Sequence, residues 1–505
     1  MAKLTRSGRY DIVIVGAGAA GVVLARRLSE AGNRSILLID AGPDLTRDTP
    51  REFRDGWRLA EIPDWGYRPE PATAGITPRI RRGRLVGGTS WLTRFAVRGA
   101  AADFDGWATR GNPGWAFADV LPVFRRIEDD FEFGHDAFHG DAGPLPITRY
   151  PDLAPSAIHA AALDAFAALD FPPVADHNAP DAVGVGRMPF SSRDGVRVTA
   201  LDAFLPDLSA PAGVTLRTDS PVAHVLLDGL RATGIRLVDG SEIGADQVIV
   251  AAGVYGSPAI LLRSGIGGAR DLEKLGIDVA IDLPGVGENL ADHPSVSVDS
   301  GWRGAAGGAQ VLHSIATFRS SGRAAKSAPD LAIWISDPDG DEAEFAFEVL
   351  LMKPQSRGAV RLVSPDPTIA PRIELPGVRD TTDAARLAEG HALALELANR
   401  REVRLLAEAP PASNPGNEKA RRRAVVEMYY SIPHTVGTCR MGPSAAEGDV
   451  VDSLGRVHGT EGLSVIDASI IPEPTAGFPH LITIMLADLL GERLNAEFSS
   501  NSPVQ

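Results

Sequence analysis

A glycine-rich turn near the start of the chain constrains the fold more than any other feature. Residues 10–15 form a short apolar run, residues 19–31 have helical spacing, and residues 35–40 (SILLID) form a second apolar run. Short apolar runs on either side of a helix are typical of buried parallel strands joined by a crossover. The sequence therefore predicts that the chain opens with a strand, a helix and a parallel strand.

Three glycines, Gly16, Gly18 and Gly21, lie where the first predicted strand turns into the helix. Glycines at this spacing let the backbone turn tightly and approach a pyrophosphate, which then faces the positive end of the helix. Asp40 ends the second strand, 19 residues after Gly21. A carboxylate at that place accepts hydrogen bonds from ribose hydroxyls and repels a 2′-phosphate. A glycine-rich turn of this type can also bind no ligand. Here its position after the strand and the presence of Asp40 favour a dinucleotide-binding site, but the motif does not show which dinucleotide is bound.

The composition excludes several classes of protein. The chain has 505 residues, of which 44% are hydrophobic and 23% charged, so it is long enough for two or three globular domains and is neither disordered nor fibrous. A formal net charge of −15 makes nucleic acid a poor partner. The single cysteine, Cys439, excludes an internal disulfide and a multi-cysteine metal cluster, and we predict no metal site. Because no signal-peptide pattern or apolar stretch of membrane-spanning length is present, we expect a cytoplasmic protein without a membrane span.

Further strand and helix patterns organise the rest of the chain. Residues 214–253 read as successive strands, followed by a tight turn and a helix at residues 253–267. More strand-like runs lie within residues 330–363, and residues 382–399 and 417–430 have helical spacing. These patterns predict an antiparallel sheet with covering helices in the middle of the chain. The end returns to a strand at residues 463–467 and a helix from about residue 481 to 494.

Four separated blocks resemble the signature regions of the glucose-methanol-choline (GMC) oxidoreductases. They are RGRLVGGTSWLTRFAVRG at residues 82–99, GVYGSPAILLRSGIG at 253–267 followed by LPGVGENLADHP, HTVGTCRMG at 434–442, and residues 450–494. The resemblance implies an α/β protein, with a Rossmann-like FAD-binding domain of glutathione-reductase type and an α+β substrate domain built on an antiparallel sheet. It implies that residues 1–150, 200–295 and 435–505 form the FAD-binding domain and that residues 151–199 and 296–434 form the substrate domain.

The resemblance also indicates which residues contact FAD. Beside the residues of the first turn, it points to a glycine-rich loop around Thr89 and to the end of the last strand. The expected cofactor-binding residues are Gly16, Gly18, Ala19, Ala20, Gly21, Asp40, Ala41, Arg84, Gly87, Gly88, Thr89, Thr93, Val222, Asp467, Ala468 and Pro479. Thr93 stands where the family usually has Asn. Trp91 and Leu92 occupy the loop in which members with covalently bound flavin carry a histidine, so we predict non-covalent FAD.

Two of the eleven histidines lie in motifs that can carry chemistry, His434 and His480. Oxidation of an alcohol needs a base with a pKa near neutral within reach of the hydroxyl proton, and histidine meets this need. By resemblance His434 takes that proton as hydride passes to flavin N5, and His480 holds the oxygen. The helix after His480 would direct its N-terminus at the flavin pyrimidine. We interpret the other histidines as structural, including His139, His293 and His458, and Cys439 as a small buried residue.

The sequence thus predicts an FAD-dependent alcohol oxidase or dehydrogenase that produces an aldehyde or ketone. A flavin-dependent lyase of the same fold, such as a hydroxynitrile lyase or a decarboxylase, is the alternative, and a redox-inactive scaffold is a third. The partners would be a small-molecule alcohol and either molecular oxygen or a redox-partner acceptor. Few carboxylates lie in the expected pocket strands, which favours an apolar or aromatic alcohol over a quaternary ammonium. The candidate aromatic residues of the pocket are Trp65, Tyr67, Trp91, Phe95, Trp334, Phe345, Phe347 and Phe478.

Overall fold

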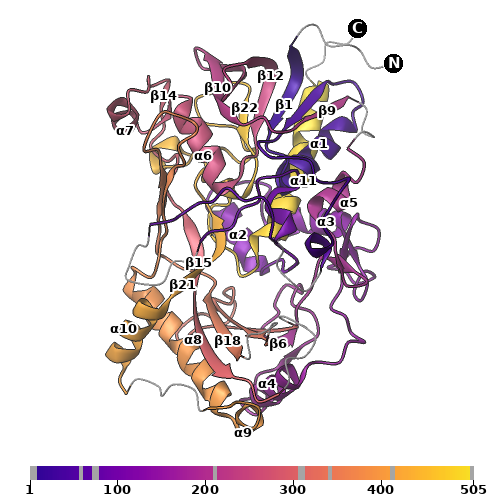
Figure 1. The fold of residues 1–505 in the computed structure, drawn as a ribbon, viewed down its shortest axis with the longest axis vertical. Coiled ribbons are helices and arrows are strands. Elements are labelled where there is room, and N and C mark those ends of the chain that lie inside the picture. Colours follow the sequence, from indigo (N-terminus) through magenta and orange to yellow (C-terminus); the bar gives the residue numbers. More distant parts are fainter. Residues whose placement is uncertain are drawn as a thin grey trace.

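A computed structural model of the chain describes residues 8–55, 61–70, 79–208, 213–304, 313–338, 344–409 and 416–500. Two large sheets lie toward opposite ends of the long axis (Figure 1). Helices cover both sheets, which confirms the predicted α/β architecture with a second, antiparallel sheet. In the described part of the chain, no helix combines the length and the apolarity needed to cross a membrane.

The first sheet is built around the opening strand. Its order is β10-β11-β12-β1-β2-β9, with β22 paired to β12. Strand β1 (Arg9–Val15) is parallel to both neighbours, β2 (Ile36–Ile39) and β12 (Glu242–Val250). The apolar run of β1 is buried because the strand lies inside the sheet, between helices. The other strands are β9 (Val214–Arg217), β10 (Val222–Asp228), β11 (Arg231–Leu237) and β22 (Leu463–Val465).

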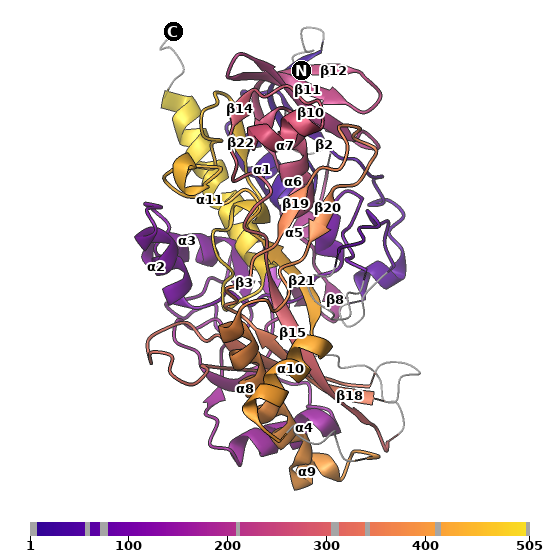
Figure 2. The same cartoon turned by 90° about the vertical axis from the view of Figure 1, so that its left-hand side faces the viewer.

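Two helices from opposite ends of the sequence pack together beside this sheet. Helix α1 (Ala19–Ser29) follows β1 directly, and α11 (Pro479–Ser500) is the last helix of the chain. Figures 1 and 2 both show them side by side. The N-terminus of α11 therefore comes close to the region between the sheets, although its sequence lies more than 400 residues after the first turn.

The second sheet has the order β21-β15-β18-β17-β16-β6-β5. Most neighbours are antiparallel, and only β5 and β6 are parallel. One face packs against helix α8 (Thr381–Asn399), which lies along the sheet in Figure 2. The strands are β5 (Pro173–Val174), β6 (Gly184–Arg187), β15 (Ala291–Gly301), β16 (Ser314–Phe318), β17 (Leu331–Ser336), β18 (Glu344–Leu351) and β21 (Tyr430–Val436).

Shorter elements connect the sheets and flank them. The helices are α2 (Ala101–Thr109), α3 (Phe117–Ile127), α4 (Ala157–Ala167), α5 (Ala200–Phe204), α6 (Gly253–Arg263), α7 (Ala269–Lys274), α9 (Arg401–Arg404) and α10 (Glu418–Met428). Single turns are η1 (Arg51–Arg54), η2 (Gly88–Trp91), η3 (Ala445–Glu447) and η4 (Ala468–Ile470). Paired short strands are β3 (Glu128–Asp130) with β4 (Leu145–Ile147), β7 (Ser192–Arg193) with β8 (Val196–Arg197), β13 (Ile266–Gly267) with β14 (Ile281–Asp282), and β19 (Ala359–Arg361) with β20 (Arg372–Glu374).

The predicted elements are present, with differences at some ends. The helix expected at residues 417–430 stops at Met428, and Tyr430 begins β21. Pairing of β21 with β15 outweighs helical spacing there, because it places these side chains against the rest of the second sheet. Strand β15 itself has no counterpart among the predicted elements. Its many polar residues and Pro294 weaken the alternating apolar pattern that marks a strand.

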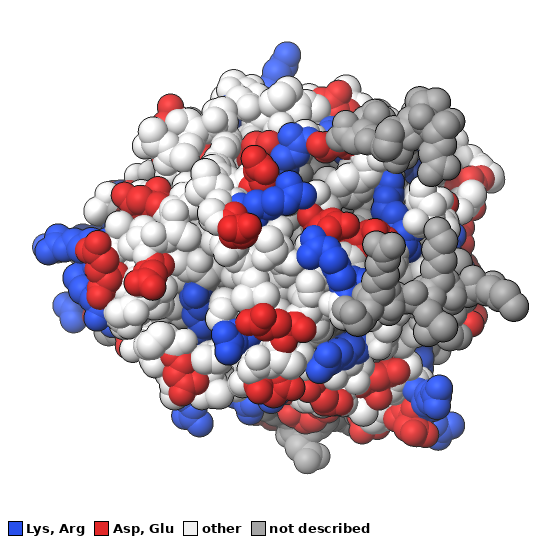
Figure 3. Space-filling model, turned by 90° about the horizontal axis from the view of Figure 1, so that it is seen from above, with Lys and Arg blue, Asp and Glu red and all other residues white. Residues whose placement is uncertain are grey.

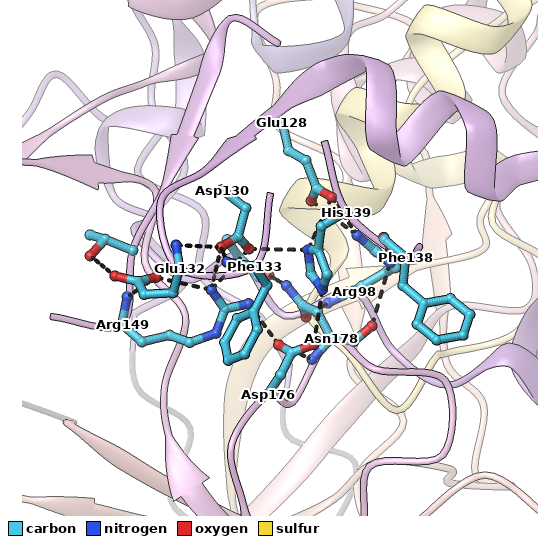
Figure 4. A network of polar contacts seen from close by, with 12 residues as sticks. Arg98, Glu128, Asp130, Glu132, Phe133, Phe138, His139, Arg149, Asp176 and Asn178 are labelled. Atoms are coloured by element: carbon cyan, nitrogen blue, oxygen red, sulfur yellow. Dashed lines mark hydrogen bonds and ion pairs between the residues drawn. The ribbon is translucent and has the colours of Figure 1, made fainter. Parts of the chain in front are cut away.

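A buried network of charges ties the segment after α3 to neighbouring loops (Figure 4). Both side chains of the Arg98–Glu128 pair are fully buried, and their closest atoms are 2.9 Å apart. His139 lies between carboxylates, with Nδ1 3.1 Å from Asp130 and Nε2 2.9 Å from Asp176. Burial opposes a charge on this ring, but hydrogen bonds to the surrounding carboxylates raise the pKa of His139 to about 10.

Three members of this network, Glu128, Asp130 and His139, have the spacing of metal ligands. Arg98 already pairs with Glu128, and Arg149 pairs with Asp130 at 2.9 Å. The carboxylates are therefore compensated by guanidinium groups and by the protonated imidazole, and the network joins parts of the fold by charge pairing.

Candidate active site

A cavity of about 1550 Å³ extends from the glycine-rich turn after β1 to strands β17 and β18 of the second sheet. Its volume exceeds the roughly 300–1,000 Å³ of common small-molecule pockets. Both predicted catalytic histidines line it, together with most of the predicted cofactor residues: Gly16, Gly18, Ala19, Ala20, Asp40, Ala41, Arg84, Gly88, Thr89, Thr93, Val222, Asp467, Ala468 and Pro479. The remaining two, Gly21 and Gly87, are buried and do not line the cavity.

The glycines of the first turn make different contributions to the structure. A Cβ atom on Gly18 would meet nothing within 4 Å, so this residue leaves open space at the cavity wall. A Cβ on Gly21 would lie 1.8 Å from the carbonyl oxygen of Gly16, so Gly21 permits close packing of α1 against the turn. Gly88 approaches the same turn from the second loop, and a Cβ there would lie 2.9 Å from the Cα of Gly18.

Asp40 lies at the cavity with its carboxylate held by the backbone. The amide of Ala17 donates to Oδ2 and that of Gly42 to Oδ1, each at 2.8 Å. Burial raises the pKa of Asp40, while these hydrogen bonds oppose the rise. The side chain is thus oriented at the end of β2, where a carboxylate can accept from a ribose.

Asp467 lies in another part of the cavity wall and accepts hydrogen bonds from three residues. Its carboxylate accepts from the amide of Gly253 at 2.8 Å, from Ser257 Oγ at 2.5 Å and from the amide of Ser469 at 2.7 Å. The start of α6, the end of β22 and turn η4 are therefore joined at one buried side chain. Burial raises the pKa of Asp467.

These features fit FAD. The open space beside Gly18, the oriented acceptor Asp40 and the N-terminus of α1 suit a ribose and a pyrophosphate. The cavity continues past Thr89 and Ala468 to the N-terminus of α11 at Pro479. It is therefore long enough to take an extended dinucleotide and leaves further volume beside the second sheet.

His434 lies on β21 and faces this further volume. Its Nδ1 is 3.2 Å from Nδ1 of His293 on β15, and its backbone amide donates to Asp292 Oδ1 at 2.9 Å. Its ring packs on Phe478, with 4.7 Å between the ring centroids. Burial, with smaller contributions from His293 and Arg82, lowers the pKa of His434 well below its usual value. The imidazole is therefore neutral near pH 7 and can accept a proton.

His480 reaches the same cavity from another element. It is the second residue of α11, two positions after Phe478, whose ring contacts His434. Burial and the nearby Arg197 lower the pKa of His480 to about 4. Two neutral imidazoles, from positions 434 and 480, thus line the same cavity.

Sequence reasoning missed two residues beside His434. The sequence indicates only a structural role for His293, yet this residue contacts the ring of His434 and is 1% exposed. Burial lowers the pKa of His293 to about 3. Burial raises the pKa of Asp292 to about 7, although hydrogen bonds from Ser431 and from the backbone of His434 oppose the rise. The LADHP block that carries both residues was the available signal, but only pairing of β15 with β21 reveals the contact.

The aromatic predictions for the pocket were partly wrong. Five of the candidates line the cavity: Trp65, Tyr67, Phe95, Trp334 and Phe478. Phe345 and Phe347 instead point to the opposite face of β18 and pack in the core beneath α8, because side chains alternate along a strand. Trp91 is 1% exposed, and its Nε1 donates to the carbonyl of Val86 at 2.9 Å. It therefore supports the glycine-rich loop from behind.

Comparison with known proteins identifies the class. Models of the GMC oxidoreductase family match residues 10–295 and 354–487. The chain is 34% identical to a 5-(hydroxymethyl)furfural oxidase of Methylovorus sp. (strain MP688), over 96% of this chain and 98% of that protein. It is 30% identical to an oxygen-dependent choline dehydrogenase of Escherichia coli O139:H28, over 97% and 96%. The crystal structure of pyridoxine 4-oxidase from Mesorbium loti superposes with a TM-score of 0.89 at 31% identity, and the match covers 96% of this chain and 99% of that one.

The chain belongs to the GMC oxidoreductase family. It is an FAD-dependent oxidoreductase of the class that acts on CH–OH groups of donors. The predicted alternative, a lyase on the same fold, finds no support among these relatives.

Proposed function

We propose that His434 is the general base and that His480 is the second group that holds the substrate oxygen. This assignment rests on the observation that both imidazoles line one cavity. Its walls include residues of the second sheet as well as the residues that fit FAD. The lowered pKa values keep both rings neutral. A neutral imidazole can accept the hydroxyl proton, and a second one can donate a hydrogen bond to the oxygen that gives it up.

The contact with His293 supports the choice of nitrogen on His434. Because Nδ1 of His434 is used toward His293, the other ring nitrogen, Nε2, is the one left for a substrate. Within the described part of the chain, no side chain or backbone group hydrogen-bonds to that nitrogen. When His434 donates the hydrogen on Nδ1 to His293, it presents Nε2 as a proton acceptor to an alcohol in the cavity.

Bound FAD supplies the acceptor for the hydride that leaves the carbinol carbon. On the protein side, α11 begins at Pro479, which has no N–H, so the first unpaired backbone N–H of the helix is that of His480 at the cavity wall. Non-covalent binding is supported by Trp91 and Leu92, which offer no nucleophile in the glycine-rich loop. Thr93 contributes a hydroxyl to the same wall.

The substrate is a small alcohol, and the electron acceptor is molecular oxygen or a redox partner. The relatives named above act on hydroxymethyl-furfural, choline and pyridoxine, and the aromatic residues of the wall suit an apolar or aromatic body. Nucleic acid is not a partner in this proposal. On the face in Figure 3, the acidic and basic side chains of the described residues are interspersed. The lone buried Cys439 supports a cytoplasmic location.

The two sheets support the proposed division of the chain. Residues 1–150, 200–295 and 435–505 contain the first sheet, α1 and α11, and would form the FAD-binding domain. Residues 151–199 and 296–434 contain most of the second sheet and would bind substrate. Strand β15 begins before residue 296, and β21 ends after residue 434, so two strands of the second sheet cross the proposed boundaries.

The test is anaerobic reduction of the purified FAD-loaded protein by a panel of alcohols. We expect loss of the oxidised flavin absorbance with at least one alcohol. His434→Ala should retain bound FAD yet slow this reduction by roughly 10²–10⁴-fold, which is the usual contribution of a positioned general base. His458→Ala, in which the altered ring lies outside the cavity, is the matched control and should reduce at the wild-type rate. Equal rates for His434→Ala and the wild type would remove His434 from the mechanism.

A further inference from the structure

One carboxylate of the second sheet, that of Glu348, lines the cavity. Glu348 lies between Phe347 and Val349 on β18, and both of these neighbours point into the core beneath α8. Strand alternation therefore turns Glu348 to the other face, where it lines the cavity beside Trp334 and Ser336 of β17. The sequence suggested few carboxylates at the pocket, and Glu348 is the one that the strand register brings there.

Two hydroxyl groups donate hydrogen bonds to the carboxylate of Glu348. Ser336 Oγ donates to Oε1 at 2.7 Å, and the hydroxyl of Tyr430 donates to Oε2 at 2.8 Å. Each oxygen thus accepts from one hydroxyl and has a further lone pair for another donor. The two partners come from β17 and β21, so three strands hold the side chain in place.

The charge of Glu348 has no cationic partner in the described part of the chain. The Lys and Arg side chains found there in ion pairs contact other carboxylates; Lys353, the nearest along the sequence, pairs with Asp103 at 2.7 Å. The rings of His434 and His293 are neutral. A partly buried carboxylate without a counter-ion is costly, and a positive group on a bound molecule would offset this cost.

Two aromatic residues, Trp334 and Tyr430, line the cavity together with Glu348 and His434. Trp334 is the cross-strand neighbour of Glu348, and its ring centroid is 6.5 Å from that of His434. Tyr430, whose hydroxyl donates to Glu348, lies four residues before His434 on β21. At the usual strand rise of about 3.3 Å per residue, the backbones of Tyr430 and His434 are about 13 Å apart. Aromatic faces next to a carboxylate favour organic cations.

We infer that Glu348, with Ser336, Tyr430 and Trp334, forms a subsite for a positively charged group on the substrate. The substrate is then an alcohol whose carbinol group lies at His434 and whose ammonium lies at Glu348, with an apolar body about the size of one aromatic ring between them. This inference rests on the proposed function, because it uses His434 as the end of the cavity at which the alcohol reacts.

The first experiment compares two alcohols of the same shape. For para-(aminomethyl)benzyl alcohol and para-methylbenzyl alcohol, kcat/KM is measured with the holoenzyme, with Glu348→Gln and with Glu344→Gln. Glu344 is an exposed acid on the same strand, so its variant carries the same change of charge outside the cavity. We expect the wild type and Glu344→Gln to prefer the ammonium compound by roughly tenfold or more. In Glu348→Gln this ratio should fall to within about twofold of one.

The second experiment measures binding without turnover. The dissociation constant of para-methylbenzylamine, which has no hydroxyl, is determined by calorimetry for the same three holoproteins. We expect binding to Glu348→Gln to be roughly tenfold weaker or more than binding to the wild type, with Glu344→Gln unchanged. Equal affinities for the wild type and Glu348→Gln overturn the subsite, whether or not any alcohol is oxidised. Weaker binding to Glu348→Gln together with no alcohol oxidation would support the subsite and count against the proposed function, so the two failures are distinguishable.

Discussion

The Nδ1 atoms of His293 and His434 lie 3.2 Å apart, although 141 positions separate the two residues in the sequence. One of the two nitrogens must carry the hydrogen that lies between them. If His434 donates, its Nε2 is a free acceptor that faces the cavity. His293 is then a positioning residue that selects the tautomer and ring orientation of the proposed base.

Replacement of His293 should test this role. We expect His293→Ala to slow alcohol-dependent flavin reduction by roughly tenfold to a hundredfold, because the ring of His434 loses its partner. His293→Asn keeps an acceptor and should lose less. A merely structural role would lower the melting temperature of both variants without separating their reduction rates.

The pH dependence of catalysis follows from the lowered pKa of His434. A base is active when it is deprotonated, and a pKa below 6.5 keeps His434 deprotonated at and above neutral pH. The decrease in kcat/KM that results from protonation of His434 should therefore occur below pH 6.5. In His293→Ala it should move up toward 6.5, because one of the contributions that lower the pKa of His434 is removed. An acid limb at the same pH in both proteins would contradict the coupling.

Removal of His480 should affect kcat more than KM. We expect His480→Ala to lower kcat for the best alcohol by roughly 10²-fold, the usual effect of one lost hydrogen bond to a developing oxyanion. The KM should change less, since the bond strengthens as the hydroxyl loses its proton. A change in KM alone, measured in steady-state kinetics, would make His480 a binding residue.

Two glycines of the first turn should respond differently to alanine. A Cβ at position 21 would meet the carbonyl oxygen of Gly16, whereas one at position 18 would project into open space. Gly21→Ala should therefore lower the melting temperature of the apoprotein. Gly18→Ala should melt as the wild-type apoprotein does but bind FAD more weakly, which fluorescence titration measures. Equal FAD affinity of Gly18→Ala and the wild type would place the cofactor away from this turn.

The buried network around His139 predicts how stability depends on pH. Its folded-state pKa is raised from the usual 6.5 to about 10. The stabilisation is therefore complete below about pH 6.5 and is lost as pH rises toward 10. His139→Gln should lack this loss, whereas a change at the exposed His135 should keep it. Urea unfolding between pH 6 and 10 compares the two variants, and parallel curves for wild type and His139→Gln would refute the assignment.

The first sheet and the turns that fit a dinucleotide were predictable because their signals are local. Residues 10–40 carry the strand, the glycines and the acid within one βαβ unit, and the spacing that binds a pyrophosphate is set along the chain itself. The two cavity histidines were found through motifs in their own segments. Strand β15 was missed because its polar residues and Pro294 hide the alternation of a strand.

What the sequence determined by itself is thus the class of fold, the turn that suits a dinucleotide and the two histidines of the cavity. The tertiary structure alone decided that His293 supports His434, that Glu348 faces the cavity, and that Phe345, Phe347 and Trp91 belong to the core. The physical reason is the register of strand pairing. Side chains alternate between two faces of a strand, and antiparallel pairing chooses their neighbours from distant segments, so a shift by one residue would reverse every one of these assignments on the second sheet.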